Sequence, residues 1–240
     1  MRTRNLYDPA SRDPYPLSRS KVELFLQCPR CFYLDRRSGI GRIDGPPYTL
    51  NLAVDALLKR EFDAYRLRGE AHPIMTMYGV DAVPFRHKDF LEWRDGKGMH
   101  VFHAPTRFDV FGIIDDLWVN EKGEILIVDY KATSTIADIS IDGRDSYKRQ
   151  IEFYQWLFRQ HDFSVSDTGY FLFANAVKDR DLFDRQLEFT MQILPYEGKD
   201  GWVDDALRGA FDVLQEDLPP PSTESCEWCG YRREARDIEN

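Results

Sequence analysis

Two carboxylates and one amine are set into the apolar segments in the middle of the chain. Asp115 interrupts one apolar segment, and Asp129 and Lys131 stand where the run Ile125-Leu126-Ile127-Val128 ends. Burying such charges together is costly unless a cation or a phosphate organises them. Because carboxylate oxygens are the ligands that Mg²⁺ and similar cations prefer, the pattern indicates a divalent-metal site. The alternative is a surface hairpin with solvated charges, since connecting segments are usually polar.

Two predicted strands position these side chains. Residues 107–119 mix β-branched and aromatic residues, and the polar, glycine-closed stretch 120–123 then predicts a hairpin loop. The continuous apolar run 125–128 is typical of a strand covered on both faces. Side chains two apart on a strand share a face, so Asp129 and Lys131 project together and Tyr130 projects oppositely. If the strands pair as neighbours, Asp115 meets the face of Asp129.

The ordered pair Gly112-Ile113-Ile114-Asp115 and Val128-Asp129-Tyr130-Lys131 resembles the core motif of the PD-(D/E)XK nuclease superfamily. In particular it resembles the RecB-like branch, which includes CRISPR-associated RecB-like exonucleases and the AddB nuclease domain. The resemblance implies that Asp115 and Asp129 hold Mg²⁺ or Mn²⁺ and that the backbone carbonyl of Tyr130 is a further ligand. It also implies that Lys131 positions or polarises the attacking water.

The apolar spacing predicts a helix over residues 51–68, which carries Asp55. In RecB-like nucleases the corresponding helix often carries a histidine that completes the metal shell. Asp55 is at the matching position, and an aspartate oxygen is also a suitable ligand for Mg²⁺ or Mn²⁺. An ordinary solvated aspartate is the alternative.

A second predicted helix, residues 146–161, carries Gln150 and Tyr154 four positions apart and therefore on one face. This pair resembles the QxxxY motif of RecB-like nucleases, which implies that both line the catalytic site. Lys148 and Arg149 are candidate phosphate contacts. The alternative is a core-facing tyrosine beside a surface glutamine.

The cysteines form two pairs, Cys28-Pro-Arg-Cys31 and Cys226-Glu-Trp-Cys229. CxxC spacing lets two thiolates converge on one metal, so two pairs offer four sulfur ligands. The pairs stand near opposite ends of the chain, and we expect residues 18–37 and 219–232 to meet there. Disulfides and four unrelated cysteines are the alternatives. Tetrathiolate sites hold zinc or iron–sulfur clusters.

The run SRSKVELFLQCPRCFYLDRR, residues 18–37, also resembles the first helix of RecB-like nucleases. Several of these nucleases bind a four-iron, four-sulfur cluster through one cysteine before the nuclease core and three after it. The chain departs from that pattern, because no cysteine follows Cys229 and Cys31 would supply the fourth ligand. The resemblance therefore implies a four-iron, four-sulfur cluster, with Zn²⁺ as the alternative.

Composition sets broad limits. Hydrophobic residues at 42% and charged residues at 30% are ordinary for a soluble globular protein. No apolar run reaches the ~18 residues of a membrane span, and the first residues lack the apolar centre of a signal peptide, so we expect a cytoplasmic protein without a membrane partner. The net charge of −9 argues against a uniformly basic nucleic-acid coat but permits one basic face. Arg30, in the positively charged N-terminal segment, is a candidate DNA contact.

Together these observations predict one α/β domain over residues 1–240, with a restriction-endonuclease-like central mixed sheet flanked by helices and its terminal segments joined at the cysteine site. The predicted function is a Mg²⁺- or Mn²⁺-dependent deoxyribonuclease, exonuclease-like on DNA ends or single strands. Its partners would be DNA and proteins of recombination, repair or CRISPR adaptation. The alternatives are a DNA-binding protein with weak or no catalysis and a zinc-stapled interaction module.

Overall fold

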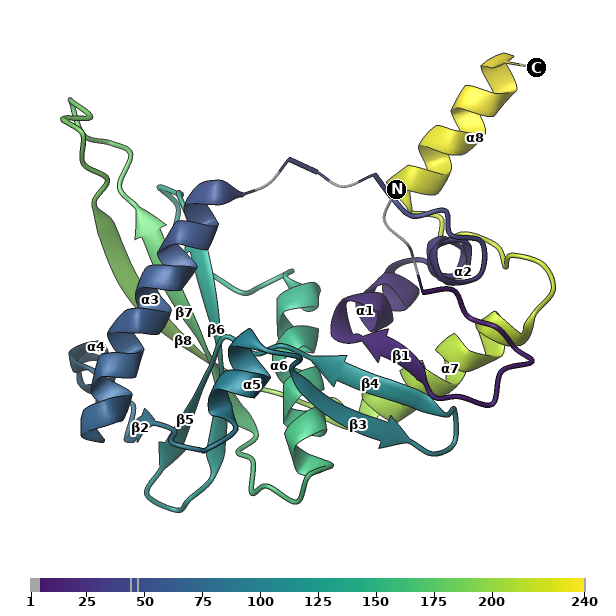
Figure 1. The fold of residues 1–240 in the computed structure, drawn as a ribbon. Helices are drawn as coiled ribbons and strands as arrows, with labels where there is room; N and C mark the ends of the chain where they lie inside the picture. Colours follow the sequence, from purple (N-terminus) through teal and green to yellow (C-terminus); the bar gives the residue numbers. More distant parts are fainter. Residues whose placement is uncertain (1–4, 44, 47, 240) are drawn as a thin grey trace. The chain divides into compact units, whose positions relative to one another are not determined.

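The apolar runs in the middle of the chain pair as a five-stranded mixed sheet in the order β2-β5-β6-β7-β8. Strands β6 and β7 are parallel, and the other neighbouring pairs are antiparallel. The strand that carries Asp129 and Lys131, β6, is therefore the middle strand of the sheet. The computed structural model in Figure 1 describes residues 5–43, 45–46 and 48–239. The strands are β2 (Ala82–Pro84), β5 (Asp116–Asn120), β6 (Ile125–Thr133), β7 (Thr168–Ala176) and β8 (Phe189–Glu197).

Helices cover both faces of this sheet. On one face, Phe62 of α3 packs in a core with Trp118 of β5 and Val128 of β6. On the other face, a Cβ atom on Gly169 of β7 would lie 2.5 Å from Cγ2 of Ile151 in α6, so that helix lies close against the strands. The arrangement confirms the predicted α/β class. The helices around the sheet are α3 (Thr49–Arg68), α4 (Pro73–Met77), α5 (Phe90–Asp95) and α6 (Asp145–Arg159).

A second, three-stranded sheet has the order β1-β4-β3, with β1 parallel to β4. Pro29 separates the helices α1 and α2 at Cys28, because proline is tolerated in the first turn of a helix but not in its interior. Phe25 of α1 contacts Phe32 of α2 with ring centroids 5.5 Å apart. The elements are β1 (Tyr15–Ser18), β3 (Met99–His103), β4 (Phe108–Gly112), α1 (Arg19–Gln27), α2 (Pro29–Arg37), α7 (Val203–Gln215) and α8 (Glu227–Glu239).

The chain divides into two compact units. Unit 1 comprises Met1–Pro46, His100–Phe111 and Gly201–Asn240, and unit 2 comprises Pro47–Met99 and Gly112–Asp200. Both segments of the predicted cysteine region lie in unit 1, and the five-stranded sheet lies in unit 2. The single domain predicted from the sequence stays a prediction.

The predicted strand 107–119 is wrong in one respect, because it is two strands of different sheets. Strand β4 ends at Gly112 and β5 begins at Asp116. The hydroxyl of Tyr154 donates a hydrogen bond to the carbonyl of Ile113, so this carbonyl bonds to a side chain. A Cβ atom on Gly112 would lie 2.5 Å from Cε1 of Tyr154, so only glycine leaves room for the ring. Asp115 consequently lies in the break before β5 rather than inside a strand.

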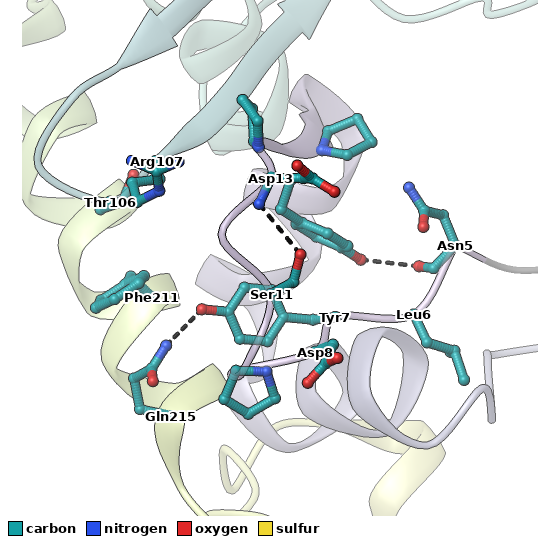
Figure 2. A pocket seen from close by; sticks show the side chains of 14 residues that line it. Asn5, Leu6, Tyr7, Asp8, Ser11, Asp13, Thr106, Arg107, Phe211 and Gln215 are labelled. Carbon is teal, nitrogen blue, oxygen red and sulfur yellow. Dashed lines mark hydrogen bonds between the residues drawn. The ribbon is translucent and has the colours of Figure 1, made fainter.

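The proline-rich N-terminal segment encloses a cavity of about 360 Å³ within unit 1 (Figure 2). Internal hydrogen bonds hold its lining: the Tyr15 hydroxyl donates to the carbonyl of Asn5 at 2.9 Å, and the amide of Gln215 in α7 donates to the Tyr7 hydroxyl. The first bond closes the segment on itself, and the second ties it to α7. No helix in the described part of the chain has both the length and the apolar character needed to cross a membrane.

Candidate active site and cysteine centre

Several predicted site residues line one cavity of about 370 Å³ in unit 2. Asp55 comes from α3, Asp115 from the break before β5, and Tyr130 and Lys131 from β6. Tyr147 of α6 also lines it, although the sequence did not single this residue out. The cavity therefore lies where the middle strand of the sheet, β6, passes its last buried residues.

Asp115 is fixed by the backbone of β6 and remains open to the cavity. Its Oδ2 accepts a hydrogen bond from the backbone N–H of Tyr130 at 2.9 Å, and its side chain is 24% exposed. Burial and the neighbouring charge of Asp129 raise the pKa of Asp115 to about 7, against the opposing effect of Lys131 and Lys59. The two carboxylates therefore resist being ionised together when no cation is bound.

Asp129 supplies the observation that tests whether a metal fits. Its side chain is buried, and neither carboxylate oxygen accepts a hydrogen bond from a described residue, although Lys131 forms an ion pair with it. Buried carboxylate oxygens without hydrogen-bond partners are costly and rare. A divalent cation shared with Asp115 would satisfy them, so the donor set fits Mg²⁺ or Mn²⁺.

Asp55 reaches the cavity but is paired with a lysine. Lys59, one helical turn further along α3, lies 2.9 Å from Asp55 Oδ2 and 3.8 Å from Asp115 Oδ1. Among the described residues, only the four cysteines bring three or more potential ligand atoms within 4.8 Å of one another. Lys59 was not predicted from the sequence, although its i,i+4 spacing from Asp55 was a signal that could have found it.

Lys131 is held from three directions. It forms the ion pair with Asp129, donates to Oε1 of Gln150 at 3.4 Å, and lies 4.7 Å from the ring centroid of Tyr147. Gln150 of the QxxxY pair thus meets the predicted catalytic lysine. Tyr154 instead bonds to the Ile113 carbonyl and shapes the break that carries Asp115. Tyr154 is therefore a residue that positions Asp115.

Asp116 differs completely from its neighbour. It is 1% exposed, and its Oδ2 accepts a hydrogen bond from the Tyr130 hydroxyl at 2.6 Å. Its Oδ1 pairs with Arg66 of α3, which also donates to the carbonyl of Phe85 at 2.6 Å. A buried carboxylate with these partners has no free face for a metal, so the structure distinguishes Asp115 from Asp116.

The predicted DNA contacts are Lys148, Arg149 and Arg30. Lys148 and Arg149 are half-buried residues near the start of α6 and are not among the described residues that line the Asp115 cavity. Arg30 belongs to α2 in unit 1, where its guanidinium donates to the carbonyl of Pro220 at 3.1 Å. Lys148 and Arg149 belong to unit 2 and Arg30 to unit 1, and their contact with DNA stays a prediction.

The four cysteines gather in unit 1, as the two CxxC pairs predict. Sγ of Cys31 lies 3.6 Å from the sulfurs of both Cys226 and Cys229, and Sγ of Cys28 lies 3.9 Å from that of Cys229. All four are buried and unoxidised, which excludes the disulfide alternative here. A tetrahedral zinc with Zn–S bonds of about 2.3 Å places its sulfurs about 3.8 Å apart. The donor set therefore fits a single tetrathiolate ion.

The thiols differ in their environments. Burial and the adjacent thiols raise the pKa of Cys229 to about 12. Burial also acts on Cys28, but hydrogen bonds from the backbone of Cys31 and Thr223 outweigh it and lower its pKa to about 7. Nη2 of Arg42 lies 3.6 Å from Sγ of Cys226, so a guanidinium already faces the sulfurs.

A family comparison settles the superfamily. The model of the PD-(D/E)XK nuclease superfamily matches residues 44–233, which is most of the chain. The chain belongs to this superfamily. Membership indicates a nuclease-type function with a nucleic-acid substrate, and PD-(D/E)XK nucleases use divalent metals. This agrees with the buried Asp129 carboxylate, whose oxygens accept no hydrogen bond from the described residues apart from the ion pair with Lys131.

Other comparisons add less to the PD-(D/E)XK assignment. One solved structure, titled "Crystal structure of SSO0001", is 13% identical and covers 88% of this chain and 81% of its own, with a TM-score of 0.37. A likeness at that TM-score carries no argument about fold or function. No curated protein matches the sequence.

Proposed function

We propose that this PD-(D/E)XK protein is a Mg²⁺- or Mn²⁺-dependent deoxyribonuclease of the RecB-like branch, exonuclease-like on DNA ends or single strands. The observation that carries the proposal is Asp129, whose two buried oxygens accept no hydrogen bond from the described residues and stand beside Asp115 and Lys131. Superfamily membership supports a nucleic-acid substrate.

Different residues of the chain would bind the cation, orient the water and contact the phosphates. Asp115, Asp129 and the backbone carbonyl of Tyr130 would hold the cation, and Asp55 would join them only after leaving Lys59. A divalent cation bound there would supply Lewis-acid stabilisation of charge that develops on the phosphate. Lys131 would donate a hydrogen bond to the attacking water, and Gln150 and Tyr147 keep the ammonium aimed into the cavity. Lys148, Arg149 and Arg30 stay candidate phosphate contacts.

For the cysteine centre, we propose a single zinc ion rather than the four-iron, four-sulfur cluster. The supporting observation is that three sulfur pairs lie 3.6–3.9 Å apart and that all four sulfurs lie within 4.8 Å of one another, which suits four thiolates on one ion. A cluster with one iron for each cysteine holds its thiolates further apart. Elemental analysis of anaerobically purified protein tests this choice: zinc near one per chain without iron supports it, and iron with labile sulfide would overturn it.

Cleavage assays test the catalytic proposal. End-labelled single- and double-stranded DNA would be incubated with Mn²⁺, Mg²⁺ or chelator, using the wild type, Lys131→Met and a control, Lys122→Met, from the exposed β5–β6 turn. Cleavage that requires metal and Lys131, but not Lys122, supports the nuclease, and the product ladder gives its polarity. Cleavage that survives Lys131→Met would end the site assignment.

A second candidate function is DNA binding without cleavage. The observation that favours it is Lys59, whose ammonium lies against both Asp55 and Asp115 where a cation would be needed. That protein would bind DNA and leave it intact with every metal tested. A zinc-stapled interaction module would neither bind nor cleave DNA. For the nuclease, proteins of recombination, repair or CRISPR adaptation stay candidate partners.

A further inference from the structure

A second cavity of unit 1, about 430 Å³ in volume, has four arginines among its seven described lining residues. Arg30 of α2 and three arginines of α8 converge on it, together with Pro221, Ser222 and Cys229. No carboxylate stands among the described residues of the lining. In a chain with a net charge of −9, such a concentration of positive charge is not a consequence of average composition. The arginines of α8 are Arg232, Arg233 and Arg236.

The placement of charges on α8 explains how this cavity becomes purely cationic. Arg236 is four positions from Arg232 and three from Arg233, so the three guanidiniums share one helix face. Glu234 stands two positions from both Arg232 and Arg236, which turns it away from that face. Arg30 then approaches from α2, held by its 3.1 Å hydrogen bond to the carbonyl of Pro220. The helix therefore separates its charges, and the basic side faces the cavity.

A structural explanation for these arginines would be compensation of the negatively charged thiolates, since Cys229 borders the cavity. A different residue already performs that task. Nη2 of Arg42, outside the cavity lining, lies 3.6 Å from Sγ of Cys226. Nε of Arg236 lies 3.8 Å from Oδ1 of Asp237, which offsets part of the positive charge. The repulsion that remains between converging guanidiniums is relieved by a polyvalent anion. The planar fork of arginine matches phosphate oxygens in a bidentate arrangement.

We propose that this cavity, formed by Arg30, Arg232, Arg233 and Arg236, binds backbone phosphates of a nucleic-acid strand. The choice of a strand rests on the proposed nuclease function, whereas the choice of phosphate rests on the arginines alone. The site belongs to unit 1 and shares no lining residue with the Asp115 cavity. It would contribute affinity without sequence preference, because backbone phosphates carry no base information.

Binding measurements in chelator, where no metal-dependent cleavage occurs, test the proposal. The probe is a fluorescent oligothymidylate single strand, titrated with wild type, Arg232→Gln/Arg233→Gln, and the control Arg180→Gln/Arg185→Gln from the turn between β7 and β8. Arg232 and Arg233 are exposed helix residues, so the double variant is expected to fold. The expected result is at least tenfold weaker binding for the α8 variant and no change for the control. The slope of log affinity against log salt should fall by about 0.7 for each phosphate that the variant no longer neutralises.

Four further outcomes would each contradict the proposal. Equal affinity and salt slope in wild type and the α8 variant would overturn the proposal, as would undiminished binding of an uncharged methylphosphonate strand. Inorganic phosphate that competes as well as the strand, at equal phosphate concentration, would make this a small-anion site and also overturn it. If the α8 variant loses zinc or iron while the wild type and the control keep it, the arginines stabilise the cysteine centre, and the proposal is overturned.

The catalytic proposal fails separately. Strand affinity in chelator and metal-dependent cleavage are separate measurements, and the two cavities share no lining residue. A protein that cleaves nothing but shows the arginine-dependent affinity would contradict the nuclease and leave the phosphate site standing. A protein that cleaves DNA normally but binds the strand independently of Arg232 and Arg233 would support the nuclease and contradict the phosphate site.

Discussion

Asp115 and Asp116 are consecutive in the chain, yet one opens to a cavity and the other is buried in an ion pair. Asp115 lines the 370 Å³ cavity with a side chain that is 24% exposed. Asp116 is 1% exposed between Arg66 and the hydroxyl of Tyr130. Asp115 lies in the bend before β5, whereas Asp116 is the first residue of that strand.

This contrast predicts opposite effects of one substitution at the two positions. Asp116→Asn should destabilise the protein by up to about 3–5 kcal/mol, because it removes one of the two carboxylates that pair with the buried guanidinium of Arg66, the other being Asp63. Asp115→Asn should leave the free energy of unfolding nearly unchanged, since its amide oxygen can still accept from Tyr130 and the repulsion with Asp129 disappears. It should abolish metal-dependent cleavage. Urea unfolding and the DNA assay measure the two effects, and the opposite assignment of effects would contradict the proposed site.

Gly112 is predicted to be sensitive to the smallest side chain. Gly112→Ala places a methyl group against Cε1 of Tyr154, which must move and so weaken its hydrogen bond to the Ile113 carbonyl. Overpacking of this kind destabilises by roughly 1–3 kcal/mol. Gly201→Ala is the matched control, because a Cβ atom there meets no described atom within 4 Å. Equal denaturant midpoints for the two variants would show that the ring adjusts freely.

Lys59 is predicted to compete with the divalent cation. Its ammonium lies 2.9 Å from Asp55 and 3.8 Å from Asp115, so a cation at these carboxylates meets like-charge repulsion. Lys59→Met should therefore raise the affinity for Mn²⁺ several-fold in isothermal titration, while Lys122→Met leaves it unchanged. Weaker Mn²⁺ binding in Lys59→Met would mean that the lysine supports the site rather than opposing the cation.

Asp35 is predicted to stabilise unit 1 in a pH-dependent way. Burial alone would raise its pKa, but hydrogen bonds from Lys21, at 2.8 Å, and Arg36, at 2.6 Å, outweigh burial and lower the pKa. A lowered pKa means that the stabilisation is present above the unfolded value of about 3.9 and is lost as the pH falls towards the folded value. Asp35→Asn should cost about 3–5 kcal/mol at pH 7.

Thermal unfolding of Asp35→Asn and wild type between pH 7 and pH 3 measures this dependence. The difference in melting temperature should be largest near neutrality and should narrow below about pH 4. Asp212→Asn, an exposed residue of α7, is the control and should follow the wild type throughout. A difference that stays constant across the range would show that the charge of Asp35 is not its contribution.

Features that depend on the spacing of side chains within one short segment could be predicted from the sequence alone. The apolar run 125–128 predicted the middle strand β6, and the helical spacings predicted α3 and α6 within a few residues. The two CxxC pairs predicted a four-sulfur site, which the structure confirms as a cluster of cysteines. The motif containing Asp115 and Asp129 indicated the superfamily that the family comparison then showed. Each apolar run, helical spacing, CxxC pair and nuclease motif is formed by residues that are close together in the chain.

Contacts between residues far apart in the chain could not be predicted from the sequence and are seen only in the folded protein. The Tyr154 ring against Gly112 and the Ile113 carbonyl mark the break before Asp115, and Arg66 of α3 takes Asp116 out of the site. Lys59 reaches Asp115 because α3 packs on the sheet, and Arg30 joins the arginines of α8 because α2 and the C-terminal segment fold into one unit. Local periodicity fixes which face a side chain takes within its own element. The neighbours it meets there are fixed by how elements far apart in sequence pack together.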